Sequence, residues 1–404
     1  MRRIRVLMGE SLVGTIDFEA RTNKQISTFR YDAAWMESGF AIAPSMPLAT
    51  GTFYSSAPSS DPRPALPGAI ADGAPDGWGR RLIAGDLGGR PSELDYLLAV
   101  NDRTRQGALR FVGERGVPLA DKIPPVPRMA ALSGIRRLAN AFETGRGDLR
   151  EVAHELRGAG STLGGARPKS DFEDADGTLH IAKYTTERDT LPIERLEVAT
   201  LELAGEAGLR AAKARLALGR SSYPVALIRR FDRTGNHRHH YISAKTFLGF
   251  SANETGCYAD LADAMRSACG EHLHGELREL HRRILFSILV SNDDDHLKNH
   301  GFIREGETWR LSPAFDINPN PDGSTRLHTG ISEPNDIEPS IEAVVEAAPL
   351  FDVDKEEARE DARRMAGVVA ARWRPLCAAA GMTRTECARY EPAFRRAVGE
   401  TAKT

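Results

Sequence analysis

One stretch decides the fold and the chemistry of the chain: residues 284–317, which read ILFSILVSNDDDHLKNHGFIREGETWRLSPAFDI. Its first seven residues are almost entirely apolar, which is typical of a buried helix. The chain then turns strongly polar over residues 291–300, and two short strand-like segments follow on either side of a turn at residues 304–307. The stretch therefore predicts a buried helix, a polar loop and a hairpin, with one further aspartate, Asp316, at the exit of the hairpin.

The polar loop carries the residue types of a phosphoryl-transfer site. Asp294 and Asn299 are five residues apart, which is the spacing of the catalytic Asp and the metal-binding Asn in a protein-kinase catalytic loop. Asn299 and Asp316 offer hard oxygen ligands, which suit magnesium better than zinc. Charged groups beside an apolar helix are costly to bury unless they bind a metal or a charged ligand. We therefore favour a site over the alternative, an exposed acidic loop with a helix C-cap.

The composition is that of an ordinary globular protein. The 404 residues exceed one typical core, so two or three subdomains are expected. The formal net charge is −2, which gives no general attraction to nucleic acid, and the four cysteines show no zinc-binding spacing. No stretch has the length of a membrane span or the pattern of a signal peptide, so we expect a cytoplasmic protein that contacts no membrane.

The N-terminal part predicts β structure followed by short helices. Residues 3–8 and 12–18 alternate around a Gly-containing break and predict a hairpin, and residues 29–32 predict a further strand. Residues 43–70 are rich in Pro, Ser and Gly and read as loop. Helix start signals follow at Asp76 and Ser92, and further helical patterns lie near residues 129–157.

A second chemical signal lies at residues 158–169, GAGSTLGGARPK. Glycines let backbone N–H groups approach phosphate oxygens, and hydroxyl groups add donors. The stretch is not a Walker A motif, so a linker is an equally good interpretation when it is considered alone. The strand-like segment 178–184 favours the phosphate loop, because Lys183 stands near its end as in a kinase N-lobe, although a solvated edge residue is the usual fate of such a lysine. The candidate loop residues are Ser161, Thr162, Gly164 and Gly165.

Two further segments complete the predicted nucleotide-binding region. Residues 194–207 have a helical pattern, and Glu197 within it is the candidate partner of Lys183, with a surface carboxylate as the alternative. Residues 225–233 predict a strand that leads towards a nucleotide-binding hinge. Beyond residue 243 the pattern is mostly helical, and the predicted helices span residues 257–268, 275–290, 337–349, 354–380 and 383–400.

Four blocks of this sequence resemble the HipA-type serine/threonine kinases, the toxins of bacterial type II toxin–antitoxin systems. The blocks occur in the order of the family and span nearly the whole chain. They are residues 13–16 with 72–81, residues 161–169, residues 230–233, and residues 294–299 with 312–316.

The resemblance implies an α+β fold, namely the two-lobed protein-kinase-like fold with an additional N-terminal subdomain. The β-rich N-terminal subdomain is expected at residues 1–115. The nucleotide-binding lobe with its Gly-rich loop is expected at residues 150–245, and the mainly helical lobe with the catalytic and metal-binding loops at residues 246–404.

The resemblance also implies roles for single residues. Asp294 would be the catalytic base, with His296 and Lys298 beside it at the transferring phosphate, and Asn299 and Asp316 would hold Mg²⁺. For ATP, the loop at 158–169 would cover the phosphates. The other ATP contacts implied are Lys183 on the phosphates and Arg229 and Phe231 along the adenine hinge.

This chain departs from the family at two positions. The family loop carries a Ser whose autophosphorylation moves the loop out and switches the kinase off. The aligned residue here is Thr162, with Ser161 beside it, so either hydroxyl could be modified. Asp295 stands where some members have Gly, which leaves it as an alternative base. Asp294 is preferred because it has the five-residue spacing to Asn299.

The expected activity is ATP- and Mg²⁺-dependent phosphorylation of a translation component such as an aminoacyl-tRNA synthetase. A HipB-like helix-turn-helix antitoxin would restrain the kinase and make the contact to operator DNA. Two alternatives stay open. One is a catalytically inactive kinase-like chain that only binds the antitoxin–DNA complex, against which the intact predicted site counts. The other is a metal-dependent hydrolase that uses Asp293, Asp294 and Asp295 with His296 and His300, which would leave the Gly-rich loop unexplained.

Overall fold

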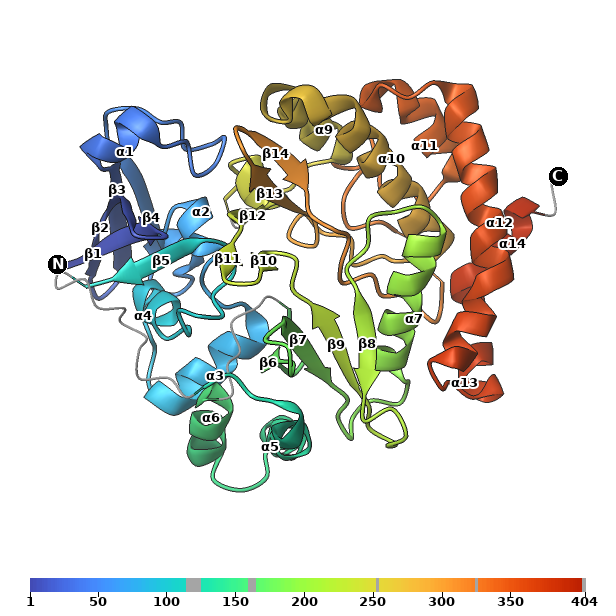
Figure 1. The fold of residues 1–404 in the computed structure, drawn as a ribbon, viewed down its shortest axis with the longest axis horizontal. Helices are drawn as coiled ribbons and strands as arrows, with labels where there is room; N and C mark the ends of the chain where they lie inside the picture. The colour runs from blue at the N-terminus through green and yellow to red at the C-terminus, as the bar shows by residue number, and fades with distance from the viewer. Residues whose placement is uncertain (114–124, 159–164, 252–253, 324–325, 402–404) are drawn as a thin grey trace. The chain divides into compact units, whose positions relative to one another are not determined.

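The computed structural model of the chain describes residues 1–113, 125–158, 165–251, 254–323 and 326–401 (Figure 1). By its internal contacts the chain divides into two compact units. Unit 1 comprises Met1–Arg188 and Asp232–Asn253, and unit 2 comprises Asp189–Phe231 and Glu254–Thr404. The domain boundaries expected from the sequence stay a prediction. Among the described residues, no helix has both the length and the hydrophobicity that a membrane crossing requires.

Unit 1 contains an antiparallel sheet of five strands in the order β4-β3-β2-β1-β5. The strands are β1 (Arg2–Met8), β2 (Ser11–Ala20), β3 (Lys24–Tyr31), β4 (Phe53–Pro58) and β5 (Leu109–Val112). Alternate residues such as Val6, Ile16 and Phe29 are fully buried, because successive side chains of a strand point to opposite faces. The predicted hairpin and third strand are present. Strand β4 lies within the stretch predicted as loop. Phe53 and Tyr54 favour a strand, but the Ser, Ala and Pro residues that follow do not, and the strand forms by pairing with β3.

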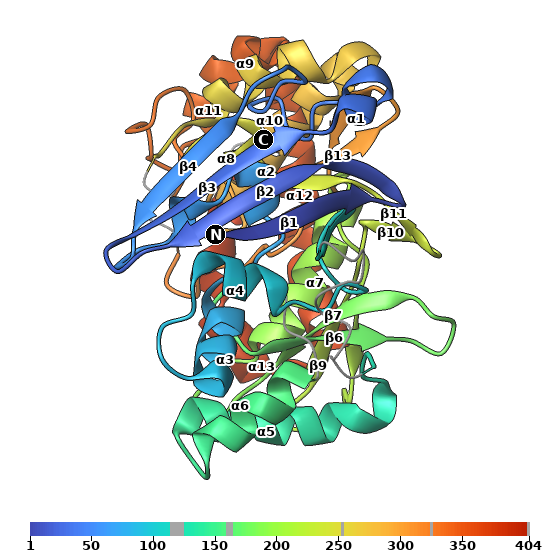
Figure 2. The ribbon, with the colours of Figure 1, turned by 90° about the vertical axis from the view of Figure 1, so that its left-hand side faces the viewer.

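Short helices accompany this sheet in unit 1. Both predicted start signals are found: Asp76 is the N-cap of one helix, and Ser92 forms a capping box with Asp95 at the start of another. The helices are α1 (Ala33–Ser38), α2 (Gly68–Ala71), α3 (Gly77–Leu87), α4 (Glu93–Leu98), α5 (Leu132–Thr144), α6 (Leu149–Gly158) and α8 (Ala244–Phe247). Figure 2 shows α3, α5 and α6 gathered below the sheet, where α6 packs on both α3 and α5.

The remaining strands of unit 1 are β6 (Lys169–Glu173), β7 (Leu179–Tyr184), β10 (Arg233–Thr234), β11 (His237–Arg238) and β12 (Tyr241–Ser243). The β6–β7 and β10–β11 pairs are antiparallel hairpins. In the β6–β7 register Lys169 lies opposite Lys183. The predicted strand at 178–184 is therefore present, and its lysine faces a second lysine from the end of the Gly-rich stretch.

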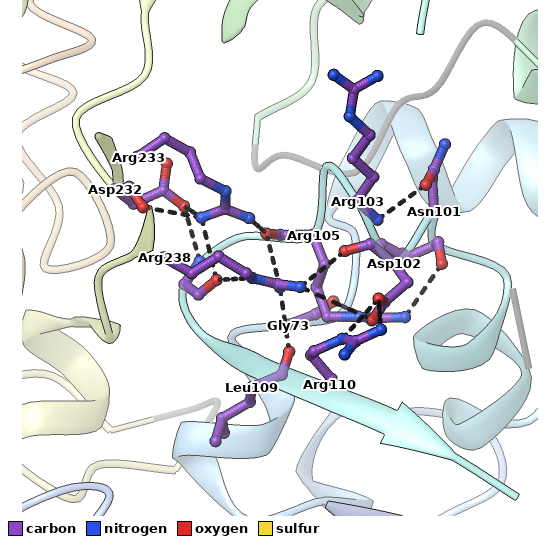
Figure 3. A network of polar contacts seen from close by, with 12 residues as sticks. Gly73, Asn101, Asp102, Arg103, Arg105, Leu109, Arg110, Asp232, Arg233 and Arg238 are labelled. Atoms are coloured by element: carbon purple, nitrogen blue, oxygen red, sulfur yellow. Dashed lines mark hydrogen bonds and ion pairs between the residues drawn. The ribbon is translucent and has the colours of Figure 1, made fainter. Parts of the chain in front are cut away.

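Arginines hold the β10–β11 hairpin to the loop at residues 101–107 (Figure 3). Arg105 is fully buried and donates to the carbonyls of Gly73, Leu97 and Val100 at 2.8–3.1 Å, and burial lowers the pKa of its guanidinium to about 10. The Gly107 carbonyl accepts from Arg233 and from Arg238, each at 3.1 Å. Asp232 accepts from the Gly107 backbone N–H at 2.8 Å. Asp232 and Arg233, the last two residues of the 230–233 block, thus anchor the loop at residues 101–107 within unit 1.

Unit 2 is mainly helical, with two hairpins. Its helices are α7 (Ile193–Glu206), α9 (Tyr258–Ala268), α10 (Leu273–Leu289), α11 (Ile341–Ala347), α12 (Lys355–Ala379), α13 (Arg384–Arg389) and α14 (Arg395–Thr401). The hairpins are β8 (Ala214–Ala217) with β9 (Val225–Arg229) and β13 (Gly301–Glu305) with β14 (Thr308–Leu311). The long α12 runs beside α7 (Figure 1).

The core of unit 2 surrounds α10, whose residues Leu277, Leu280, Ile284 and Leu285 are fully buried. The helices predicted at 257–268, 275–290 and 354–380 are present with boundaries shifted by at most two residues. The helix predicted at 383–400 is interrupted by a 3₁₀ turn at Glu391–Phe394. The interruption coincides with Pro392, which has no N–H to donate and is disfavoured in the interior of a helix.

Candidate catalytic site

The predicted catalytic loop follows α10 directly. Helix α10 ends at Leu289, and Ser291 reverses the chain with a left-handed φ of 53°, a conformation that a non-glycine residue rarely adopts. The Ser291 hydroxyl donates to the Ala393 carbonyl at 2.8 Å and accepts from Arg396 at 3.1 Å, which fixes this turn. Asn292 accepts from the backbone N–H of Asn318 at 3.1 Å. The start of the loop is therefore joined to the segment that contains Asp316.

Within the loop, Asp294 and Asn299 are in direct contact. The side-chain amide nitrogen of Asn299 donates to the Asp294 carbonyl at 2.7 Å, and its backbone N–H donates to the His296 carbonyl at 2.7 Å. The bond of the side chain uses the amide nitrogen, so the amide oxygen is the atom left to act as a ligand. His296 Nε2 lies 3.8 Å from Asp294 Oδ1, and the Asp294 side chain is 63% exposed.

Asp316 lies close enough to Asp294 for the two carboxylates to repel each other. Partial desolvation raises the pKa of the Asp294 carboxyl above its ordinary value, and the charge of Asp316 raises it further, while His296 and His328 oppose this shift. Asp316 has a left-handed φ of 56°, and Asn318 donates to its Oδ1 at 2.9 Å. A cation bound between the two carboxylates would offset this repulsion between like charges.

The donors present fit magnesium. Asn299 and Asp316 offer hard oxygen ligands, and Mg²⁺ is commonly held by one or two protein oxygens together with water and phosphate oxygens. In the described part of the chain, no group of three or more His, Cys, Asp or Glu side chains is placed to hold a metal. The remaining ligands would therefore have to come from nucleotide phosphates and water, as in kinase sites.

The segment that carries Asp316 is fastened to α10 and to the chain before β8. Glu276 of α10 forms a bidentate pair with Arg210 and accepts from the Leu311 backbone N–H at 3.0 Å. Arg283, also on α10 and fully buried, donates to the Ser312 carbonyl at 2.6 Å. The Ala314 N–H donates to the Arg210 carbonyl at 2.6 Å. Asp316 thus extends from a segment held on rigid elements, which a catalytic geometry requires.

Asp295, the alternative base, is a buried structural carboxylate. Its side chain accepts from the Tyr258 hydroxyl at 2.6 Å and from the His328 backbone N–H at 2.8 Å, and its carbonyl accepts from the Thr329 hydroxyl at 2.9 Å. Burial raises the pKa of the Asp295 carboxyl, and the hydrogen bonds from Tyr258 and the His328 backbone oppose the shift. Since this carboxylate is occupied and only 1% of the residue is exposed, the geometry favours Asp294 as the group that meets a substrate hydroxyl.

The predicted phosphate-binding residues belong to unit 1. Lys183 is 8% exposed and Lys169, its partner in register, is 6% exposed, so Lys183 is not a solvated edge residue. Gly165 has a φ of 97°, and its carbonyl accepts from the Trp78 backbone N–H at 3.1 Å. Ser161, Thr162 and Gly164 lie outside the described residues.

Comparison with known families accounts for most of the chain. Residues 4–112 match the HipA N-terminal domain, and residues 161–373 match the HipA-like C-terminal domain. The chain belongs to the HipA family. The resemblance read from the four sequence blocks is thereby confirmed.

Solved structures show that the fold is that of HipA. The HipA-family chain is similar to HipA of Shewanella oneidensis MR-1, solved with HipB and its operator DNA, with a TM-score of 0.72 and 17% identity. This match covers 99% of the present chain and 97% of that chain, and it confirms the α+β kinase-like fold class. The Helicobacter pylori proinflammatory kinase CtkA gives a TM-score of 0.42 at 12% identity, over 60% of this chain and 90% of that one. No curated protein matches the chain significantly.

Four of the remaining predicted residues of the HipA-family chain lie in unit 2. Arg229 ends β9 and donates its N–H to the Lys213 carbonyl at 2.7 Å. The ring of Phe231 lies 5.5 Å from that of Phe315, the residue before Asp316. Glu197 is 2% exposed on α7, so it is not a surface carboxylate. Lys298 is exposed on the catalytic loop.

The hydrolase alternative finds no support in the loop geometry. His300 is buried, its Nε2 lies 3.1 Å from the Tyr258 hydroxyl, and burial lowers its pKa to about 3. The His296 side chain is 35% exposed and lies beside Asp294. The two histidines therefore sit in different surroundings, and the four-residue spacing does not create a shared ligand pair.

Sequence reasoning missed His328. Its ring lies 5.5 Å from the ring of His296, and its backbone N–H holds Asp295. His328 stands alone in the sequence RLHTG, with no spacing that marks it. Only the fold brings this residue to the catalytic loop.

Proposed function

We propose that this HipA-family chain is a serine/threonine protein kinase that uses ATP and Mg²⁺, works in the cytoplasm and acts as the toxin of a toxin–antitoxin pair. The observation that carries the proposal is the arrangement of Asp294, Asn299 and Asp316 in unit 2. An accessible carboxylate with two oxygen donors for a hard cation beside it is the set of groups that phosphoryl transfer uses.

In the proposed reaction, the oxygen of a Ser or Thr hydroxyl attacks the γ-phosphorus of ATP, and the bond from that phosphorus to the β,γ-bridging oxygen breaks. Asp294 accepts the hydroxyl proton, so the products are a phosphoester, ADP and a protonated Asp294. Magnesium, when bound by Asn299 and Asp316, would neutralise negative charge on the phosphates. Lys298 would add positive charge at the transferring group, and His296 would orient Asp294 from its position 3.8 Å away.

The nucleotide roles are part of the same proposal. Lys183 would bind the phosphates and Glu197 would pair with it, while Arg229 and Phe231 would line the adenine. The burial of Lys183 and Glu197 supports the first two of these roles, because a buried charge requires a partner.

Regulation and partners extend the proposal. HipA of Shewanella oneidensis MR-1 was solved with HipB and operator DNA. We expect a HipB-like helix-turn-helix antitoxin to bind the present chain. The antitoxin would contact operator DNA, so this chain would meet the DNA only indirectly. The expected protein substrate is a translation component such as an aminoacyl-tRNA synthetase. Autophosphorylation of Ser161 or Thr162 would add about −2 charge at the loop that should receive ATP phosphates, and so would switch the kinase off.

Intact-mass spectrometry after incubation with Mg²⁺ and ATP tests the proposal. The wild type should gain phosphate that maps to Ser161 or Thr162, and the Asp294→Asn and Asp316→Asn variants should not. Asp293→Asn is the matched control: Asp293 accepts from Asn320 Nδ2, and an asparagine oxygen can accept the same bond. This control should be phosphorylated like the wild type.

The starting mass must be measured first, since purified protein can already carry phosphate. An unphosphorylated wild type that binds ATP but never transfers phosphate would instead support the inactive kinase-like alternative. A protein that binds no nucleotide would overturn the kinase proposal altogether.

A further inference from the structure

Helix α3 is bonded directly to residues 165–169, which we call the loop exit because they follow the Gly-rich residues. The Trp78 backbone N–H donates to the Gly165 carbonyl at 3.1 Å, and its indole Nε1–H donates to the Lys169 carbonyl at 3.0 Å. Arg81 donates to the Ala166 carbonyl at 3.2 Å. Three hydrogen bonds thus run from the first turns of α3 to backbone carbonyls of the five-residue loop exit.

The first of these bonds is a helix cap supplied by the loop exit. The first N–H groups of any helix have no partner within the helix. Among the described residues, the side chain of Asp76, the N-cap of α3, makes no capping bond. The Gly165 carbonyl takes the Trp78 N–H instead. The start of α3 and the loop exit therefore stabilise each other.

Close approach of the two segments depends on Gly77. A Cβ at this position would lie 3.0 Å from the Gly165 oxygen and 3.2 Å from the Ala166 Cα, both of them backbone atoms. Such contacts are tighter than nine in ten real Cβ contacts, so a side chain would require the loop exit to move by a few tenths of an ångström. Gly77 is the first residue of α3 and has no left-handed φ, so alanine fits its backbone conformation and its effect arises from the packing against the loop exit.

The donors come from a rigid support. Trp78 is fully buried, and its ring meets that of Phe142 edge to face at 5.4 Å. The same residue reaches Lys169, which lies opposite Lys183 in the β6–β7 register. A shift of the loop exit would therefore move the end of the hairpin that carries both lysines.

We propose that Gly77 and Trp78 are positioning residues that hold the loop exit and thereby set the nucleotide affinity of the chain. The inference rests on the proposed kinase function, because it assigns the Gly-rich stretch and Lys183 to the phosphates of ATP. Gly77 and Trp78 act through the loop exit and touch no substrate.

Two variants with matched controls test the proposal. Trp78→Phe removes the indole N–H and keeps an aromatic ring, and Trp35→Phe removes an indole N–H that donates to the Phe40 carbonyl at 2.9 Å elsewhere in unit 1. Gly77→Ala inserts a methyl group against the loop exit, and Gly134→Ala in α5 inserts one into open space. Each full-length protein is compared in thermal stability, in hydrogen exchange of the peptides that contain residues 76–82 and 165–173, and in the Kd of a fluorescent ATP analogue with Mg²⁺.

We expect Gly77→Ala and Trp78→Phe to speed exchange in both peptides and to raise the Kd about fivefold, the change that corresponds to one lost hydrogen bond. Trp35→Phe should lower the melting temperature and leave exchange in these peptides and the Kd unchanged. Gly134→Ala should leave all three unchanged or raise the melting temperature.

Unchanged exchange in both peptides would overturn the proposal, and so would faster exchange with an unchanged Kd. A wild type that binds no nucleotide would overturn the proposed function and the claim about affinity. In that case the exchange measurement would still decide whether Gly77 and Trp78 hold the loop exit, so the two failures are distinguishable.

Discussion

The side-chain amide of Asn299 donates to the backbone carbonyl of Asp294 across 2.7 Å. The proposed metal ligand and the proposed base are therefore joined by one bond that closes this loop on itself. This bond gives a physical reason for the five-residue spacing: the amide nitrogen closes the loop, and under the proposed function the amide oxygen would be the atom that binds Mg²⁺.

Asn299→Ala should abolish phosphate transfer with little effect on stability, because it removes the ligand oxygen and the loop-closing donor together. Asn299→Asp keeps an oxygen and loses the donor. We expect it to retain transfer at a rate reduced about 100-fold, in the range of single catalytic hydrogen bonds. Initial rates at several Mg²⁺ concentrations check both variants. Asn320→Ala, which loses the bonds of the Asn320 side chain to Asp293 and to the Asp322 backbone N–H, is the control, and equal losses in all three variants would contradict the prediction.

Glu276→Gln should lower the free energy of unfolding by about 3 kcal/mol, the cost of breaking a buried ion pair. Glu276 pairs with Arg210 and Arg310 and also accepts the Leu311 N–H, so its charge holds the segment that leads to Asp316. Urea unfolding measures the loss. Glu271→Gln is the control, since the Glu271 side chain is 85% exposed, and it should change stability by less than about 0.5 kcal/mol.

His300 should make the protein sensitive to acid. Burial lowers its pKa from 6.5 to about 3, so the folded state binds a proton less readily than the unfolded state. The stability from the neutral ring is present above pH 6.5 and is lost as the pH falls towards 3. Between pH 7 and pH 5 the loss from this residue is about 2 kcal/mol.

Urea unfolding of His300→Gln at pH 7 and pH 5 checks this expectation. The variant should be less stable than the wild type at pH 7, because the 3.1 Å contact with Tyr258 is altered, but should lose less stability between the two pH values. His272→Gln, at a histidine that is 35% exposed, should keep the wild-type pH dependence. The prediction fails if His300→Gln also keeps the wild-type dependence of stability on pH.

Gly107→Ala should destabilise unit 1 more than Gly147→Ala does. Both glycines have a left-handed φ, +73° and +81°, so the backbone cost of alanine is about 1 kcal/mol at either position. A Cβ at Gly107 would in addition lie 3.2 Å from the backbone N and O of Tyr241, whereas a Cβ at Gly147 meets nothing within 4 Å. Melting temperatures of the two variants isolate this packing contribution, and equal shifts would contradict the expectation.

Sequence reasoning worked best where the determinants lie close together in the chain. The start of α4 needs only Ser92 and Asp95, and the contact between Asp294 and Asn299 joins residues five apart. Apolar periodicity of 3.6 residues placed α10 and α12 because it follows from helix geometry alone. The family resemblance used the same local blocks.

The features that could not be predicted from the sequence depend on contacts between residues far apart in the chain. The Trp78 indole meets Lys169 across 91 residues of sequence, and Asp295 meets the hydroxyl of Tyr258 across 37. His328 reaches the catalytic loop through the same kind of contact. Strand β4 forms by pairing with β3, because only Phe53 and Tyr54 among its residues favour a strand.

The division of the chain into two units limits which fragments and hybrids of the gene can fold. The chain changes unit at residues 188, 231 and 253, so no single cut yields either unit whole. A fragment limited to residues 161–373, the span of the C-terminal family match, would contain the loop exit and the β10–β11 hairpin without Trp78 and Arg105, which hold them. We therefore expect a hybrid gene that joins halves from two parents to fold only when both halves supply these contacts.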